Sequence, residues 1–292
     1  ATLTEDDIGF MIGPRINAAS RMDSPALAAQ MLAAKEKEEG TELAKQLNAI
    51  NDERKTLVAT IVKEAHKRLN TGEFDDSPLI VMGNPSWRPG VLGLVASKLV
   101  ESHKKTVFLW GREGGEVLRG SCRSDGNVNV VELMQGATDA FDHFGGHHAS
   151  GGFSVLDDRI HELASALRKA YEAAGNVEMP EAEVLVERSV DLAEAPFAIK
   201  VIEKLAPFGV GNAKPLLLFP NVTIVSGKVF GKTSNHLELS FAKNNARMVG
   251  IAFFTTGENF TKKVEMGHSH DIVGHLERDW RGGPRIRIVD VI

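Results

Sequence analysis

Two adjacent histidines between two pairs of glycines form the segment of this 292-residue sequence with the clearest chemical potential. The segment Phe144–Phe153 reads FGGHHASGGF. Glycine pairs weaken helices and strands, and they occur where φ must be positive or where the backbone approaches another group closely. Backbone N–H groups free of Cβ atoms can surround an oxyanion, so the segment predicts a phosphate-binding turn. Its glycines are Gly145, Gly146, Gly151 and Gly152.

The histidine that follows the first glycine pair, His147, could donate a hydrogen bond to a phosphate group. An imidazole titrates near neutral pH, so its neighbours decide whether it is charged. The alternative interpretation is a structural turn that contains one buried histidine. For the next residue, His148, the structural interpretation is favoured.

The segment GSCRS, from Gly120 to Ser124, combines a hydroxyl with a guanidinium. On a strand, Ser121 and Arg123 share one face while Cys122 points to the other. An arginine fork beside a hydroxyl donor is a compact phosphate site, although an ion pair between domains would also explain the arginine. Cys122 would need a base and an electropositive pocket to act as a nucleophile, so we interpret it as a buried strand residue.

The elements that would position these residues begin with helices. Ser24 is a typical N-cap and Pro25 a typical first-turn residue. From there to about Asn70, apolar residues recur at spacings of three, four and seven, and Gly40-Thr41 predicts a break into a shorter and a longer helix. A helix of about thirty residues spans roughly 45 Å. It is either a surface helix or a connector between two domains.

A strand–helix–strand unit follows and carries the chemical segments. PLIVMG (78–83) and KKTVFLW (104–110) flank a helix at 84–103, which predicts a parallel pair. Further strands are expected at 116–124 and 152–156, and further helices at 129–141 and 158–174. Trp87 and Arg88 precede the helical part of this segment, whose N-terminus falls near Gly90 to Gly93 and is a ready anion site. The indole could stack on a base or pack in the core.

The last third of the sequence predicts a small β-barrel. An edge strand is expected within 176–190, a helix around 197–205, and a tight turn at LAPFGVGNAKP. Five short β-type runs follow, separated by Gly, Asn and Lys turns, as in a closed barrel. Basic and aromatic side chains in these runs are typical of a platform for single strands. The runs are 216–230, 236–242, 247–254, 270–277 and 285–292.

Composition limits the class of protein. Hydrophobic residues make up 42% and charged residues 25% of the sequence, as in a globular protein with a core. The net charge of −5 gives no global basic field, but basic residues outnumber acidic ones in Arg88–Arg123 and Lys200–Ile292. A single cysteine excludes an internal disulfide and fits a reducing cytoplasm. No apolar run reaches membrane-spanning length, so no membrane is expected.

Three segments, in this order, resemble those of RecJ-type single-strand-specific exonucleases of the DHH phosphoesterase superfamily. They are IGPRINAASRM; SWRPGVLGLVASKL with GSCRS and GGHHASGGF; and LAPFGVGNAKP. The resemblance implies an α/β chain with a long connecting helix, a DHH-associated domain and an oligonucleotide-binding (OB-like) β-barrel. The expected divisions are a remnant of the DHH domain at 1–24, connecting helices at 25–71, the DHH-associated domain at 72–176 and the barrel at 177–292.

The resemblance also implies a function. The chain is expected to be the C-terminal part of an exonuclease that degrades single-stranded DNA from 5′ to 3′ in DNA repair and recombination. Its partners would be single-stranded DNA and the metal-bearing DHH domain of the same full-length protein. The complete enzyme would use Mn²⁺ or Mg²⁺. The Asp- and His-rich motifs that hold these ions in the family do not occur in this sequence, so hydrolysis is expected only together with that domain.

The family's site residues correspond to particular positions of this sequence. The resemblance implies that His147 faces the metal centre as a catalytic residue and that Ser121 and Arg123 hold the 5′ phosphate. It implies that Arg15 and Arg21 line the same region, and that the four glycines contact the substrate. Two alternatives remain: an oligonucleotide or dinucleotide phosphodiesterase of the DHH family, and a stand-alone nucleic-acid-binding module such as the tail of an alanyl-tRNA synthetase.

Overall fold

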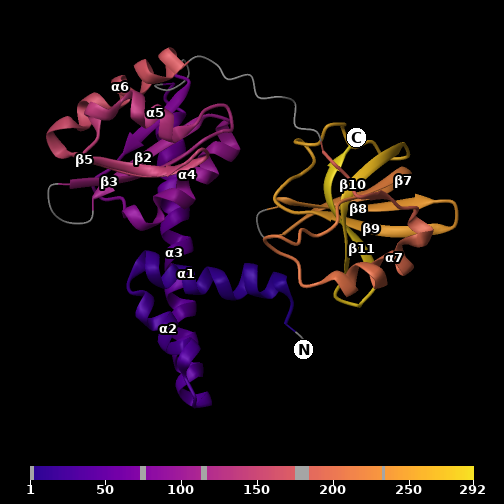
Figure 1. Cartoon of the computed structure of the whole chain (residues 1–292). Helices are drawn as coiled ribbons and strands as arrows, with labels where there is room; N and C mark the ends of the chain where they lie inside the picture. The colour runs from indigo at the N-terminus through magenta and orange to yellow at the C-terminus, as the bar shows by residue number, and fades with distance from the viewer. Residues whose placement is uncertain (1–2, 73–76, 113–116, 175–183, 232–233) are drawn as a thin grey trace. The chain divides into compact units, whose positions relative to one another are not determined.

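The chain forms two compact units in a computed structural model that describes residues 3–72, 77–112, 117–174, 184–231 and 234–292. One unit extends from Asp6 to Ala182, and the other joins Ala1–Glu5 with Glu183–Ile292. The first combines helices with a five-stranded sheet, and the second is a β-barrel with one helix (Figure 1). No helix in the described part of the chain has the length and hydropathy needed to cross a bilayer.

Helices begin the first unit. They are the π-helix η1 (Asp7–Ile12), α1 (Gly13–Met22), α2 (Pro25–Ala33) and α3 (Lys37–Leu69). The predicted cap is confirmed, because the Ser24 hydroxyl accepts a hydrogen bond from the Ala26 N–H at 3.2 Å. The predicted break at Gly40-Thr41 is wrong: the chain leaves the helix at Ala34 and re-enters it after the extended Glu36. Gly40 lies in the first turn of α3, where one glycine costs only about 1 kcal/mol.

The sheet of the first unit has the strand order β1-β2-β3-β5-β4. The predicted parallel pairing of β1 with β2 is confirmed, and the other neighbours are antiparallel. The strands are β1 (Leu79–Gly83), β2 (Thr106–Arg112), β3 (Val117–Arg123), β4 (His143–His147) and β5 (Ser150–Leu156). The helices are α4 (Pro89–His103), α5 (Val130–Gly136) and α6 (Ile160–Ala174), with short 3₁₀ turns at Thr138–Ala140 and Asp157–Arg159.

Helices cover the two faces of this sheet unequally. Val107 and Leu109 of β2 pack on one face against α4 and α3. Phe108, Cys122 and Phe153 point to the other face and pack against α5 and α6. Side chains alternate along a strand, so the first face also extends over β3, β5 and β4. On these three strands it consists largely of polar residues and glycines, which are partly or fully exposed. This uncovered part of the sheet is the open face.

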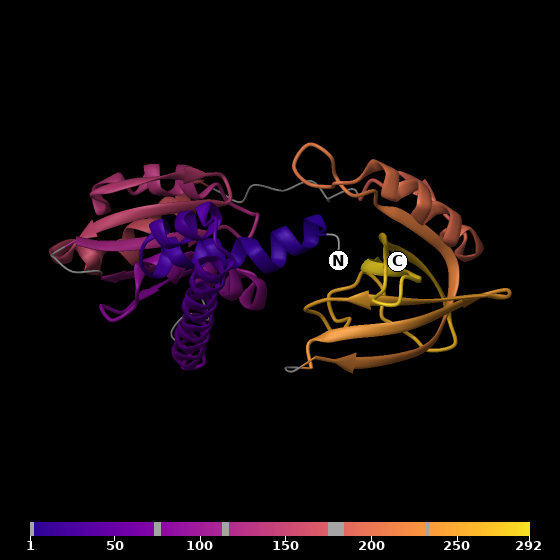
Figure 2. The same ribbon diagram turned by 90° about the horizontal axis from the view of Figure 1, so that it is seen from below.

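The second unit is a closed barrel of five strands (Figure 2). Around the ring the order is β7, β8, β9, β11 and β10; β10 pairs with β7 to close it, and the short β6 also pairs with β7. The turn at LAPFGVGNAKP is structural, because the Asn212 amide donates to the carbonyls of Leu205 and Pro207 at 2.9 Å each. The elements are β6 (Arg188–Ser189), α7 (Ala195–Ile202), β7 (Leu217–Phe230), β8 (His236–Lys243), β9 (Ala246–Ala252), β10 (Ser269–Arg278) and β11 (Pro284–Val291).

Candidate nucleic-acid interface

The histidine–glycine segment is a β-hairpin. β4 and β5 pair from His143 to Ser154, and only His148 and Ala149 form the connection. The predicted turn at the glycines is therefore wrong, because all four glycines lie within paired strands. Their contact with a phosphate group stays a prediction. β4 was not predicted from the sequence, because two consecutive glycines are unfavourable in the interior of a strand.

The strand registers place the predicted residues in two rows on the open face. In one row, Gly145 of β4 lies opposite Gly152 of β5, which lies opposite Ser121 of β3. In the next row, His147 of β4 lies opposite Ser150 of β5, which lies opposite Arg123 of β3. Since i and i+2 share a face, both rows face the same side. The predicted shared face of Ser121 and Arg123 is part of this arrangement.

The four glycines divide into two kinds. A Cβ at Gly146 would lie 2.3 Å from the carbonyl oxygen of Ser150, and one at Gly151 would lie 2.8 Å from the Met134 methyl group. Gly146 is therefore required by the close approach of the β5 backbone, and Gly151 by packing against Met134 of α5. A Cβ at Gly145 would meet nothing within 4 Å, and one at Gly152 only the Gly120 oxygen at 3.7 Å. The fold of this unit does not explain their missing side chains, so the open face is kept flat for another reason.

Arg123 lies against the first turn of α4. Its Nη2 is 2.8 Å from the position that a Cβ of Gly93 would occupy, and its Nη1 donates to the carbonyl of Cys122 at 2.7 Å. Gly93 therefore lets the guanidinium reach the N-terminal end of α4, where backbone N–H groups favour anions. The sequence indicated an anion site near Gly90 to Gly93, but it did not link Gly93 to Arg123.

Arg21 reaches the same turn of α4 from the helical part. Its Nη1 donates to the carbonyl of Gly90 at 3.1 Å, and its own carbonyl lies 2.4 Å from the Cβ position of Gly90. Gly90 and Gly93 are three residues apart and so share one side of α4. The structure thus brings Arg21 and Arg123 to one end of one helix. Among the described residues, neither arginine forms an ion pair with a carboxylate.

Arg15 lies elsewhere on the helical part. Its guanidinium donates to the Asn48 side chain of α3 and to the carbonyl of Met11. It is six residues before Arg21, so it lies almost two turns away along α1. The structure therefore separates Arg15 from the other predicted phosphate ligands.

Two further side chains have structural roles. Trp87 is 2% exposed, and its Nε1 donates to Glu64 of α3 at 3.0 Å, which selects packing over base stacking. Burial raises the pKa of the Cys122 thiol to about 12, so it is protonated at neutral pH. Neither side chain can take part in binding at the open face.

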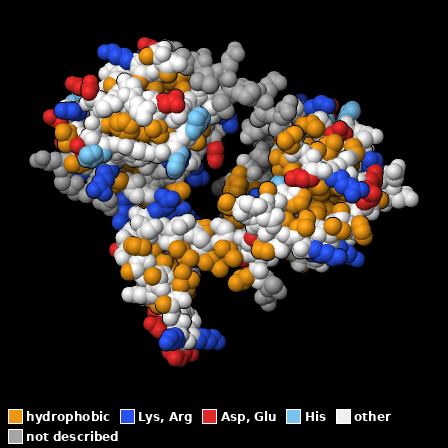
Figure 3. Space-filling model, viewed as in Figure 1, with side chains coloured by type: hydrophobic (Ala, Val, Ile, Leu, Met, Phe, Trp, Pro, Cys, Tyr) orange, Lys and Arg blue, Asp and Glu red, His pale blue; other side chains and the backbone are white. Residues whose placement is uncertain are grey.

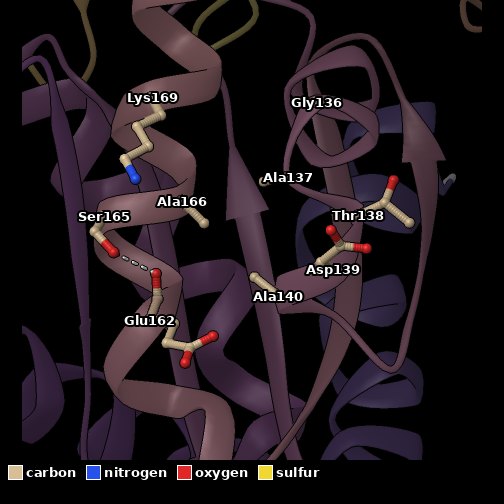
Figure 4. Close-up of a pocket in the computed structure, with 9 residues that line it drawn as sticks. All are labelled: Gly136, Ala137, Thr138, Asp139, Ala140, Glu162, Ser165, Ala166 and Lys169. Carbon is tan, nitrogen blue, oxygen red and sulfur yellow. Dashed lines mark hydrogen bonds between the residues drawn. The ribbon is translucent and has the colours of Figure 1, made fainter.

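Histidine and basic side chains surround a pale band on the visible face of the first unit (Figure 3). The exposed residues on the open face include His143, His147 and Arg119. A pocket of about 370 Å³ lies on the opposite side of the sheet, between α6 and the 3₁₀ turn after α5 (Figure 4). Lys169 and Glu162 of α6 line it together with Asp139 across the hollow, and none of the predicted site residues does.

The barrel offers separate basic and aromatic groups. Phe241 is buried in the barrel core, whereas Trp280 is 83% exposed and the Arg281 guanidinium lies 4.4 Å from its ring centre. Several cations of this unit form ion pairs with carboxylates, among them Lys228 with Glu238 and Arg285 with Glu277. Exposed aromatic and cationic groups suit stacking on unpaired bases.

The described residues do not form a metal centre. No group of three or more His, Cys, Asp or Glu side chains lies close enough to hold an ion in the part of the chain that the structure describes. Two-metal phosphodiester hydrolysis needs ions held about 3.5–4 Å apart by several carboxylates. These residues do not fit such a pair of ions.

The comparison with protein families matches both units. A DHHA1 domain matches residues 76–173, and a RecJ OB domain matches residues 190–289. The chain is RecJ-like. It is 28% identical over 295 residues to the single-stranded-DNA-specific exonuclease RecJ of Bacillus subtilis, covering 98% of this chain and 37% of the relative. It is 30% identical over 213 residues to RecJ of Thermus thermophilus, covering 73% of this chain and 30% of the relative.

Solved structures of RecJ are also similar to this chain. The crystal structure of Thermus thermophilus RecJ in complex with Mg²⁺ matches with a TM-score of 0.75 and 25% identity, over 99% of this chain and 44% of that chain. The structure of the same protein with Mn²⁺ gives the same TM-score over 42% of that chain. The RecJ-like chain thus spans less than half the length of these relatives.

Proposed function

We propose that this chain supplies the single-strand-binding and 5′-phosphate-binding part of a RecJ-type exonuclease that degrades single-stranded DNA from 5′ to 3′. Hydrolysis would require a metal-bearing DHH domain of the same full-length protein, using Mn²⁺ or Mg²⁺. The observation that carries the proposal is the position of Arg21, Ser121 and Arg123. They lie where the open face meets the first turn of α4, and no carboxylate among the described residues neutralises the two guanidiniums.

The chemistry of these groups favours a strand's end over its interior. A guanidinium binds two phosphate oxygens at once, and the Ser121 hydroxyl adds a donor on the same face. A terminal monoester carries about −1.5 to −2 charges at pH 7, whereas an internal diester carries one. Gly145 and Gly152 would let the backbone of the first nucleotides lie close to the sheet. His147, one row further, would face the scissile group, and the barrel would supply a further surface for single strands.

Binding of short single strands with a 5′-phosphate or a 5′-hydroxyl tests the proposal. The chain should bind the phosphorylated strand more tightly, and Arg123→Ala should remove that preference. A charge-assisted hydrogen bond contributes about 1.5–3 kcal/mol, so the loss should be roughly ten- to hundredfold on phosphorylated ends only. Arg123→Lys should restore part of it, because an ammonium keeps the charge without the fork.

The matched control is Arg168→Ala on α6, an exposed arginine on the other side of the sheet. It should leave the preference unchanged. If Arg123→Ala weakened both strands by the same factor, or lowered the melting temperature, Arg123 would be structural and the pocket assignment would be wrong.

A further inference from the structure

An arginine of the long helix lies in an unusual electrostatic environment. Arg54 of α3 is partly buried, and burial lowers its pKa, with the charge of neighbouring Arg21 as a further cause. Its Nη2 donates to the side chain of Asn51 at 3.0 Å, and Asn51 is itself 2% exposed. Its Nε is fully buried and has no hydrogen-bond partner. In the described residues no carboxylate pairs with Arg54.

The stability of the fold does not account for this arrangement. A partly desolvated cation loses hydration, and a second cation beside it adds repulsion, so a structural arginine would be expected to have an acidic partner. The neutral amide of Asn51 gives one hydrogen bond and no charge. A hydrophobic residue at position 54 would fit beside the core of this unit without either cost.

Arg54 lies where α1, α3 and α4 meet. Val58, one turn after it on α3, packs in the same core cluster as Met22 and Trp87. Arg88, the N-cap of α4, donates to the carbonyl of Met22, and Arg21 donates to that of Gly90. Guanidiniums from three elements therefore gather beside the α4 turn that Arg123 contacts.

We propose that Arg54 is a further guanidinium of the 5′-phosphate pocket and that it selects a dianionic phosphate monoester over a diester. The inference rests on the proposed function and adds a residue of the connecting helix to it. Arg21, Arg54 and Arg123 have no carboxylate partner among the described residues, so together they carry more positive charge than one diester neutralises, and a monoester supplies the second negative charge. The same anion would remove the repulsion between Arg21 and Arg54. Arg54 thereby discriminates the strand's end from its interior.

The test compares the ratio of dissociation constants for 5′-hydroxyl and 5′-phosphorylated single strands. Arg54→Met keeps the length of the side chain and removes its charge, and it should lower the ratio about tenfold. Arg54→Lys should give an intermediate ratio, since it keeps the charge and loses the fork. Lys55→Met is the matched control, because Lys55 is the next residue of α3, is exposed and pairs with Asp52. It should leave the ratio unchanged.

Thermal unfolding of the same variants separates binding from structure. Because Arg54→Met removes a partly desolvated cation, its melting temperature should equal or exceed that of the unmodified chain. If it were lower, Arg54→Gln would serve as a second neutral variant for the ratio. An unchanged ratio in the neutral variants, with the preference still lost in Arg123→Ala, would overturn the role of Arg54 and leave the proposed function standing. A chain with no preference for phosphorylated ends would overturn the proposed function itself.

Discussion

The glycines of the open face differ in what a methyl group would do to them. Gly145→Ala and Gly152→Ala add a Cβ in open space, so the free energy of unfolding should change by no more than about 0.5 kcal/mol. Binding of single strands should nevertheless weaken roughly fivefold, because the methyl group would prevent close approach of the sugar–phosphate backbone. Thermal unfolding and fluorescence anisotropy measure the two effects.

Gly146→Ala is the matched control in the same strand. Its φ of +156° and the contact with the Ser150 oxygen leave no room for a Cβ. We expect this variant to lose about 1–3 kcal/mol of stability, as in other overpacked sites. If Gly145→Ala destabilised the chain as much as Gly146→Ala while leaving DNA binding intact, both glycines would be structural.

Some of these residue positions could be predicted from the sequence and others could not. The period of two along a strand is enough to place Ser121 and Arg123 on one face. The approach of Arg21 to Gly90 depends on how α1 packs against α4, which local patterns do not contain. Arg54 is one of several cations on a polar helix, and only its burial and its neighbours distinguish it.

The contact between α3 and α4 includes a pair of histidines. His103 Nε2 and His66 Nδ1 are 3.0 Å apart, so one ring donates to the other. Burial lowers the pKa of His103, and the charges of His66 and Lys105 lower it further. The folded chain thus favours the neutral ring, and this contribution to stability is present above the unfolded pKa of about 6.5 and is lost as the pH falls.

The melting temperature should therefore decrease between pH 7.5 and pH 5.5, and His103→Gln should reduce that dependence. His161→Gln, at an exposed position of α6, is the control and should keep the full dependence. A pH profile that is identical in the two variants would show that the histidine pair does not couple protonation to the packing of these helices.

At the level of elements, strong periodic signals predicted the structure and weak ones did not. The amphipathic pattern predicted α3, and apolar runs predicted β1 and β2. The break of the helix was assigned to Gly40, but the chain leaves the helix at Ala34 and Gly40 lies in the first turn of α3. β4 was missed because its sequence, HFGGH, has little intrinsic preference for a strand, and its pairing with β5 outweighs that deficit.

For the whole molecule, the order of a DHHA1 domain and a RecJ OB domain favours the exonuclease interpretation over the dinucleotide phosphodiesterase, which usually lacks a barrel after the glycine segment. The four divisions expected from the sequence remain a prediction; by contacts, the helices and the sheet form one compact unit. The RecJ resemblance, unlike the composition, identified both domains.

The chain alone should bind single strands and leave them intact. With Mn²⁺ and 5′-labelled DNA, no mononucleotides should form, because the described residues contain no cluster of metal ligands. Turnover that EDTA abolishes would contradict the expected lack of hydrolysis.

The logarithm of the association constant for single strands should fall linearly with the logarithm of salt concentration, as counterions are released from phosphates. An affinity that does not change with salt would contradict the expected phosphate contacts.

Because β4 is the edge strand of its sheet, the exchange of its amide hydrogens can report DNA binding at the hairpin. Within the described chain β4 pairs only with β5, so the amides on its outer edge meet solvent, while those of β5 are bonded on both sides. Outer-edge amides should exchange for deuterium within seconds, and those of β5 should exchange only through opening of the sheet. A DNA strand bound to this hairpin would slow the exchange of the outer-edge amides of β4 and leave the exchange of the β5 amides unchanged. Hydrogen exchange would therefore locate the bound DNA without a label.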